Sequence, residues 1–186
     1  MAAVTYTVAF EGIKARMVEV QCAVAPGIPA FTIVGLPDKA VSEARERVRA
    51  ALTAMAIALP SKRITINLSP ADLPKIGSHF DLPIAVAVLS AIEIIPPDDA
   101  AATVALGELS LNGDLVPVHG ALPAAMAAAV EEKQLLCPKA CGPEAAWVGN
   151  ARVIAPNSLA QLIQHFTGQS VLANAQAGEV KTRPTS

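Results

Sequence analysis

Apolar and polar side chains alternate in the first 35 residues, which is typical of strands with one buried face. Val4–Phe10 and Arg16–Val24 both show this alternation, and the turn-forming pair Glu11-Gly12 lies between them. The two runs therefore predict a β-hairpin. A shorter apolar run, Ala30–Val34, predicts a third strand.

Helical periodicity first appears in Lys39–Met55, where apolar residues recur every three or four positions. Asp38 precedes this run and is predicted to cap the helix, because its carboxylate can accept hydrogen bonds from free N–H groups of the first turn. Glu43 and Arg47 are one turn apart in the favourable order and predict an ion pair. The arginines of this helix lie mostly off its apolar face; they are Arg45, Arg47 and Arg49.

After residue 60, short apolar runs alternate with helical patterns. Thr103–Leu111 and Asp114–Val118 are joined by Asn112-Gly113, which predicts a hairpin with a two-residue type I′ turn. The other predicted elements are the strands Arg63–Leu68, Leu135–Cys137 and Val153–Ile154, a helix that ends near Ile94 before Pro96-Pro97, and the helices Ala121–Glu132, Pro143–Val148 and Ser158–Phe166. This order predicts the α/β class, with one mixed-sheet domain over residues 1–168. Residues 169–186 are small and polar and are expected to form a flexible linker or tail.

The net charge of −2 gives no general attraction to nucleic acid or to anionic membranes, so any contact with DNA needs a local basic patch. The densest basic stretch consists of Arg45, Arg47, Arg49, Lys62 and Arg63. It is either a solvated helix face, since acidic residues are interspersed, or a surface that contacts phosphate or another subunit. Arginine binds phosphate and carboxylate groups with two hydrogen bonds.

The three cysteines have no framework spacing, and Cys137 and Cys141 lack a second pair of ligands, so we expect free thiols and no metal. The N-terminus lacks the pattern of a signal peptide, and the apolar stretches are too short to span a bilayer. A cytoplasmic protein without a membrane segment is expected. Trp147 is expected in the core, and His165 is placed near a helix C-terminus that suits an imidazolium.

Ser78 lies in PADLPKIGSHFDLPIA (70–85), a loop directly before an apolar helix. One interpretation is a nucleophile with Lys75 or His79 as its base. The other is a cap or turn residue for the helix, with Asp81 in the first turn. The capping role is favoured, because such close neighbours in one loop rarely converge on one hydroxyl. His79 itself is expected to be exposed, either as a plain loop residue or in contact with phosphate or a partner.

Four blocks in this order resemble the N-terminal region of the ComM/YifB family of magnesium-chelatase-like AAA+ proteins: FTIVGLPDKAVSEARERVRAAL (31–52), RITINLSPADLPKIGSHFDLPIA (63–85), GELSLNGDLVPVHGALPAAMAAA (107–129) and SLAQLIQHFTG (158–168). The resemblance implies a Lon-protease-like domain, related to domain 2 of ribosomal protein S5, that precedes an AAA+ ATPase. It also implies branch migration of DNA during natural transformation and a homo-oligomeric ring, expected to be a hexamer. The partners would be the motor domain of the same protein and possibly DNA.

Neither type of catalytic apparatus of these relatives is expected here. Aligned on Pro74-Lys75-x-Gly77, the serine position of Lon-type proteases falls on His79. Aligned on GELSLNGDLVPVHG, their lysine base falls near Ala124, and no lysine occurs between Lys75 and Lys133. No Gly-Lys dipeptide occurs, so a P-loop is missing. We therefore expect no cofactor in this chain, with ATP and Mg²⁺ bound only by the full-length protein.

The expected function is that of a non-catalytic N-terminal module, whose chain ends where a linker to the motor begins. A Lon-like serine hydrolase that uses Ser78 is the alternative. The candidate residues for contact with DNA or a subunit are Arg45, Arg47, Arg49, Lys62, Arg63, Lys75 and His79.

Overall fold

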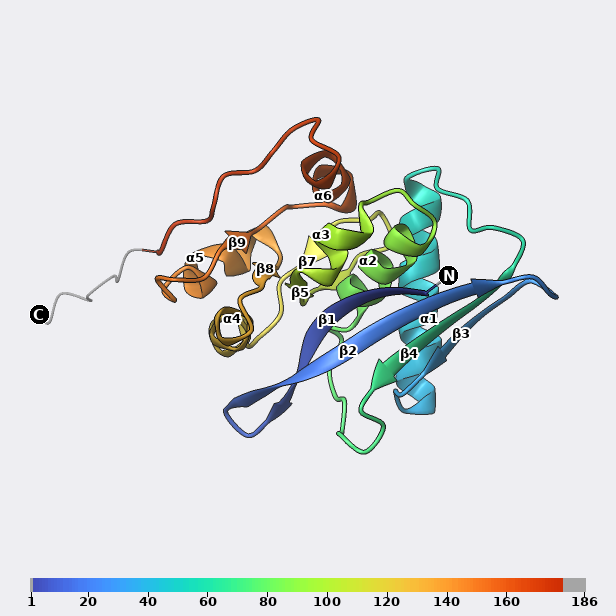
Figure 1. Cartoon of the computed structure of the whole chain (residues 1–186), viewed down its shortest axis with the longest axis horizontal. Coiled ribbons are helices and arrows are strands. Elements are labelled where there is room, and N and C mark those ends of the chain that lie inside the picture. Colours follow the sequence, from blue (N-terminus) through green and yellow to red (C-terminus); the bar gives the residue numbers. More distant parts are fainter. Residues whose placement is uncertain (1, 179–186) are drawn as a thin grey trace, which may run out of the picture.

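The computed structural model describes residues 2–178, which are built around a seven-stranded sheet with the order β3-β4-β2-β1-β5-β8-β9 (Figure 1). Its strands are β1 (Ala2–Glu11), β2 (Lys14–Ala25), β3 (Ala30–Val34), β4 (Arg63–Ser69), β5 (Thr103–Ala105), β8 (Gln134–Leu136) and β9 (Val153–Ile154). β2 runs antiparallel to β1 and β4, and the other neighbours are parallel. The predicted α/β class with a mixed sheet is confirmed.

The helices cover the sheet on both faces. They are α1 (Asp38–Ala54), α2 (Asp81–Ala91), α3 (Pro97–Ala101), α4 (Ala121–Val130), α5 (Gly142–Ala145) and α6 (Leu159–Phe166), with a short 3-10 turn, η1 (Lys139–Cys141). Side chains of α1, α2, α3 and α6 share one apolar core, and those of α4 and α5 share a second. Successive residues of β8 and β9 enter different cores, because strand side chains alternate between faces.

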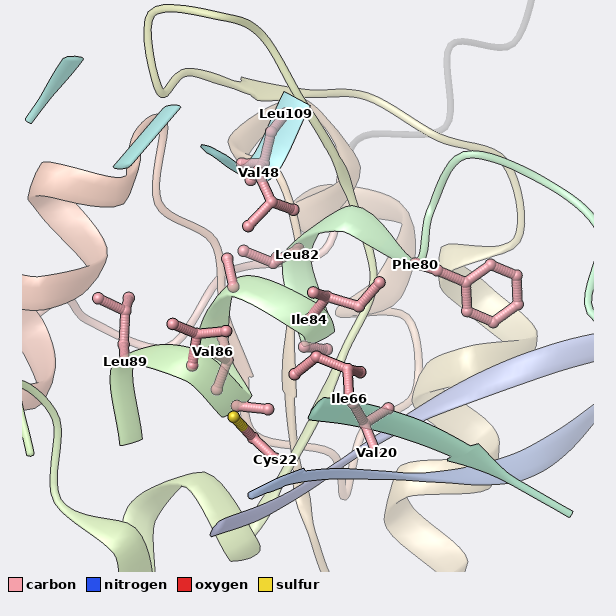
Figure 2. Close-up of a cluster of buried hydrophobic side chains, with 14 of the residues drawn as sticks. Val20, Cys22, Val48, Ile66, Phe80, Leu82, Ile84, Val86, Leu89 and Leu109 are labelled. Atoms are coloured by element: carbon pink, nitrogen blue, oxygen red, sulfur yellow. The ribbon is translucent and has the colours of Figure 1, made fainter. Parts of the chain in front are cut away.

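The larger core is centred on α2, which is buried over almost its whole length. Figure 2 shows Leu82, Ile84 and Val86 of this helix among side chains of the sheet, including Val20 and Ile66. A helix that is apolar on all sides has to be enclosed by other elements. Its position explains why the end of the loop before it, at His79 and Phe80, is buried, although most residues of that loop are exposed.

The sequence prediction of α1 and of the Asn-Gly hairpin needs two corrections. Pro37 occupies the N-cap position of α1 and makes no side-chain capping bond, while Asp38 is the first helical residue. The hairpin pairs β6 (Glu108–Leu109) with β7 (Leu115–Val116), but Ser110 N–H donates to Asp114 O at 3.0 Å around a three-residue loop. Only Gly113 in this loop has a positive φ, so the turn is not type I′.

Two further predictions on the helices and strands are wrong in detail. Residues 103–111 do not form one strand, because β5 belongs to the large sheet and β6 to the separate hairpin. Pro96-Pro97 was expected only to end a helix, yet Pro97 begins α3. Proline suits the first position of a helix, where its missing N–H is not needed.

Residues 169–178 contain no helix or strand, and they run back from α6 toward α5 and β9 (Figure 1). Ala175 N–H donates to Val153 O at 2.9 Å, and Gly178 N–H donates to Pro143 O at 3.2 Å. The predicted tail comprised residues 169–186, and residues 179–186 lie outside the described residues. The division of the chain at residue 168 therefore stays a prediction.

Candidate functional site

The loop between β4 and α2 holds the polar residues that the sequence singled out, and Lys75 is buried within it. Its Nζ donates to the carbonyl oxygens of Pro70 at 2.6 Å and of Leu73 at 2.9 Å. Burial lowers the pKa of this ammonium, and the nearby carboxylate of Asp72 opposes that effect. Lys75 therefore closes the loop on itself and is not a free surface cation.

His79 is buried too, so the expectation of an exposed loop histidine is wrong. Its Nε2 lies 2.7 Å from Val8 O, so in the neutral ring Nε2 carries the hydrogen and Nδ1 faces Gly77. A Cβ added at Gly77 would lie 2.8 Å from Nδ1, and Gly77 has a φ of +118°. The rings of Phe10 and Phe80 lie 5.2 and 4.1 Å from the imidazole. Burial lowers the pKa of His79, and the bond to Val8 raises it.

Ser78 is a turn residue before α2, which was one of its expected roles, because its carbonyl oxygen accepts a hydrogen bond from Asp81 N–H at 3.4 Å. The described residues show no hydrogen bond from its hydroxyl to either candidate base: Lys75 Nζ and His79 Nε2 bond to backbone carbonyls, and Nδ1 of His79 faces Gly77. The N-cap position of α2 is Phe80, and no side chain caps that helix, so the predicted capping role is wrong. Ser78 instead lines two hollows, of about 350 and 280 Å³, on either side of the loop.

An ion pair between Arg47 and Asp81 joins α1 to the start of α2. Arg47 Nε and Nη2 donate to the two carboxylate oxygens at 2.6 and 3.1 Å, and Leu109 N–H donates to Oδ2 at 3.1 Å. Only 1% of the Asp81 side chain is exposed, against 23% for Arg47. Burial raises the pKa of Asp81, while Arg47 and Leu109 lower it. The pair is bidentate and also holds the β6–β7 hairpin in place.

Sequence reasoning missed this pair because its members are 34 positions apart. The available signal was a lone acidic residue at the start of an otherwise apolar helix, which must find a partner once that helix is buried. The local pair that was predicted is confirmed, since Arg47 Nη1 lies 3.8 Å from Glu43 Oε2.

The basic stretch divides in the structure. Arg49 and Lys62 line one hollow of about 240 Å³, with the Arg49 guanidinium 5.8 Å from the centre of the Phe31 ring. Arg63 is exposed next to Lys62, and Arg45 is half-buried one helical turn before Arg49. We call Arg45, Arg49, Lys62 and Arg63 the basic end. The other three predicted contact residues lie elsewhere and have partners, as described above: Arg47, Lys75 and His79.

The remaining candidates are mostly structural. All three cysteines are buried free thiols, and burial raises the pKa of Cys22 to about 12. Within residues 2–178, no group of three or more His, Cys, Asp or Glu residues could hold a metal ion, and no helix is long and apolar enough to cross a membrane.

Trp147 is 53% exposed, so its predicted place in the core is wrong. His165 lies in the last turn of α6 as expected, but it is buried and its Nδ1 accepts a hydrogen bond from Leu172 N–H, which an imidazolium protonated at Nδ1 could not do.

Comparison with models of protein families assigns the chain to a family. Residues 18–141 match the family described as subunit ChlI of Mg-chelatase, and the chain belongs to this family. The match includes α1, α2 and the β6–β7 hairpin, which are the three elements joined by Arg47 and Asp81.

Individual relatives agree with this assignment. The chain is 39% identical to competence protein ComM of Haemophilus influenzae over 170 residues, which is 91% of this chain and 33% of that protein. It is 40% identical to the uncharacterized protein YifB of Escherichia coli over 136 residues, 73% of this chain and 27% of that protein. It is also 40% identical, over 97% of its length, to an uncharacterized protein of Mycobacterium tuberculosis. The chain spans about a third of the length of the curated relatives it matches.

Proposed function

We propose that this chain is the non-catalytic N-terminal module of a ComM-type, magnesium-chelatase-like AAA+ ATPase. The family membership over residues 18–141 carries the proposal, together with relatives that are about three times as long. The comparisons give no support to a Lon-like hydrolase. Among the described residues, no hydrogen bond links the Ser78 hydroxyl to Lys75 or His79, whose Nζ and Nε2 atoms bond to backbone carbonyls.

In this proposal, ATP and Mg²⁺ are bound by a motor domain of the full-length protein and not by these 186 residues. A Walker-type site needs a Gly-Lys pair at the start of a helix, and the sequence contains no such pair. Isothermal titration of this chain with Mg·ATP should therefore give no saturable heat. A one-site isotherm at micromolar protein would contradict the proposal.

For the full-length protein we propose a cytoplasmic, ATP-driven ring of subunits, a hexamer, that moves branched DNA. This chain would contribute a surface to that assembly, and the basic end is its best candidate for contact with the DNA backbone. Arg49, Lys62 and Arg63 are exposed, and none of them forms an ion pair among the described residues. Cations that are not neutralised internally remain available to phosphate groups.

Fluorescence anisotropy with branched and single-stranded DNA tests this surface. Binding should be weak, since the net charge of −2 opposes it. Its log–log dependence on salt should have a slope of roughly −3 to −4, because about four phosphate contacts release counterions. Arg45→Glu with Arg49→Glu should abolish the signal. Lys14→Glu with Arg16→Glu, on the β1–β2 hairpin, makes the same change in charge and should reduce binding much less.

Two results would assign DNA handling to the rest of the full-length protein. One is no binding even at low salt, and the other is equal binding by both double variants. The basic end would then be a solvated face or a contact between subunits. Sedimentation velocity of the same variants distinguishes these two, because only a subunit contact changes self-association.

A further inference from the structure

The free edge of the sheet at β9 is occupied by the chain's own segment 170–178, which we call the strap. One side of β9 faces β8 and the residue after it: Leu135 N–H donates to Arg152 O, and Cys137 N–H donates to Ile154 O. The N–H and C=O of Val153 therefore point to the outer edge. Both are bonded by the strap, through Asn174 Oδ1 at 2.6 Å and Ala175 N–H at 2.9 Å.

Little else holds the strap. Its apolar contacts come from Leu172 and Ala175, which are only partly buried, while Val171 is 64% exposed. The contacts at its ends are hydrogen bonds, from Ser170 N–H to Gln164 O at 3.1 Å and from Gly178 N–H to Pro143 O at 3.2 Å. A segment held by a few hydrogen bonds and little apolar area is a low-stability part of a fold and can open separately.

One of these hydrogen bonds depends on a proton. Leu172 N–H donates to Nδ1 of His165 at 2.9 Å, which requires Nδ1 to be unprotonated. The charged groups that act on this buried imidazole are Arg152, just before β9, and Asp99 of α3. Burial lowers the pKa of His165, Arg152 lowers it further, and Asp99 raises it. A proton on Nδ1 would remove the acceptor for Leu172 and add a positive charge near Arg152.

We propose that the β9 edge is a binding site for an extended peptide, that the strap occupies this site in the closed state, and that protonation of His165 opens it. The strap itself indicates which peptides fit. The site takes a peptide with a branched apolar residue at the position of Leu172, an amide side chain at that of Asn174 and a small residue at that of Ala175. Pairing of an added strand with a sheet edge is a general mode of peptide recognition.

The pH dependence has a definite sign. Because Nδ1 of His165 can accept the hydrogen bond from Leu172 N–H only when it is unprotonated, the docked state binds fewer protons than the open state. The docked state is thus fully favoured above the ordinary histidine pKa of about 6.5 and loses stability as pH falls below it. Between the ordinary and the lowered pKa, the opening constant should rise roughly tenfold per pH unit.

Hydrogen exchange of the full chain, followed by NMR at pH 7.5 and 5.5 and corrected for intrinsic rates, tests the switch. The amides of Val153, Leu172 and Ala175 should lose protection about tenfold at the lower pH, while amides of β1 and β2 should change much less. His165→Asn places an oxygen acceptor near the position of Nδ1 and cannot be protonated. In this variant the protection of the Val153, Leu172 and Ala175 amides should therefore not depend on pH. Equal protection of the wild type at both values, or an unchanged loss in His165→Asn, would overturn the switch.

A peptide added in trans tests the site itself. His165→Phe keeps an aromatic ring beside Phe166 but removes the acceptor, so its strap should open more often than that of the wild type, and equally at both pH values. A synthetic QSVLANAQAG peptide (169–178) should then shift the Val153 amide resonance of this variant and saturate. The same peptide with alanine at the position of Asn174 should bind at least about fivefold more weakly, because one hydrogen bond to Val153 is lost. Failure of the first peptide to bind the opened chain would overturn the peptide site, whatever the DNA experiments show.

Discussion

The loop before α2 and the basic end both contain cationic residues close to a hollow, but the structure uses them differently. In the loop, Lys75 and His79 are buried and bonded to backbone carbonyls. At the basic end, Lys62 and Arg63 are exposed at the start of β4. Buried cationic and titratable groups need partners, whereas exposed ones are solvated by water. Residue type alone therefore does not distinguish a structural loop from a binding surface. The distinction comes from whether the side chains are buried and hydrogen-bonded to the protein or exposed to water.

Removing one member of the Arg47–Asp81 pair should have the largest effect. Arg47→Ala leaves the Asp81 carboxylate buried without its main partner, which typically costs about 3 kcal/mol or more. We expect about 2–3 kcal/mol here, since part of the Arg47 side chain reaches solvent. Urea unfolding measures the change. Arg45→Ala is the matched control on the same helix and should stay within about 0.5 kcal/mol. Equal effects of the two variants would show that the pair adds nothing specific.

Substitution of Lys75 should have the next largest effect. Lys75→Met keeps most of the apolar side chain but leaves the carbonyls of Pro70 and Leu73 without their donor. We expect a loss of about 1–2 kcal/mol, because two hydrogen bonds from a charged donor are lost. Lys62→Met, at the basic end, is the control and should have almost no effect on the urea midpoint. A stabilised Lys75→Met variant would mean that the loop tolerates an apolar side chain better than a buried cation.

The pH dependence of stability sharpens the same comparison. Since the pKa of His79 is lowered in the folded state, its contribution is complete above about pH 6.5 and declines as pH falls toward the lowered value. The slope is at most about 1.4 kcal/mol per pH unit for one group. His79→Phe should remove this part of the slope between pH 7 and 5. The slope that remains in the variant should include the contribution of His165, whose pKa is also lowered. An unchanged slope would contradict the buried neutral imidazole.

Local patterns in the sequence were sufficient for much of the fold. The strands Ala30–Val34 and Val153–Ile154 have the predicted bounds, because alternation and turn residues define a strand without distant information. The turn around Gly113 was wrong in type, since Asn-Gly also fits a three-residue loop with a single left-handed residue. α3 was missed because proline both ends and begins helices.

The candidate site was less predictable, and the reason is distance along the chain. Whether His79 is exposed depends on Val8 and on the enclosure of α2, and neither is a local property. Asp81 was correctly placed in the first turn of a helix, but its partner is on another helix.

Ser78 gives the smallest expected effect. It is half-buried in the loop before α2, and its hydroxyl is not an N-cap and makes no hydrogen bond to Lys75 or His79 among the described residues, so Ser78→Ala should change the unfolding free energy by less than about 0.5 kcal/mol. A serine-reactive phosphonate should not label the chain, because an unactivated hydroxyl is a weak nucleophile. Mass spectrometry after incubation with the probe measures this, and casein degradation provides a second readout. Labelling that disappears in Ser78→Ala would show that the loop rearranges to bring a base to the serine. The distinction between a structural loop and a reactive one would then no longer hold.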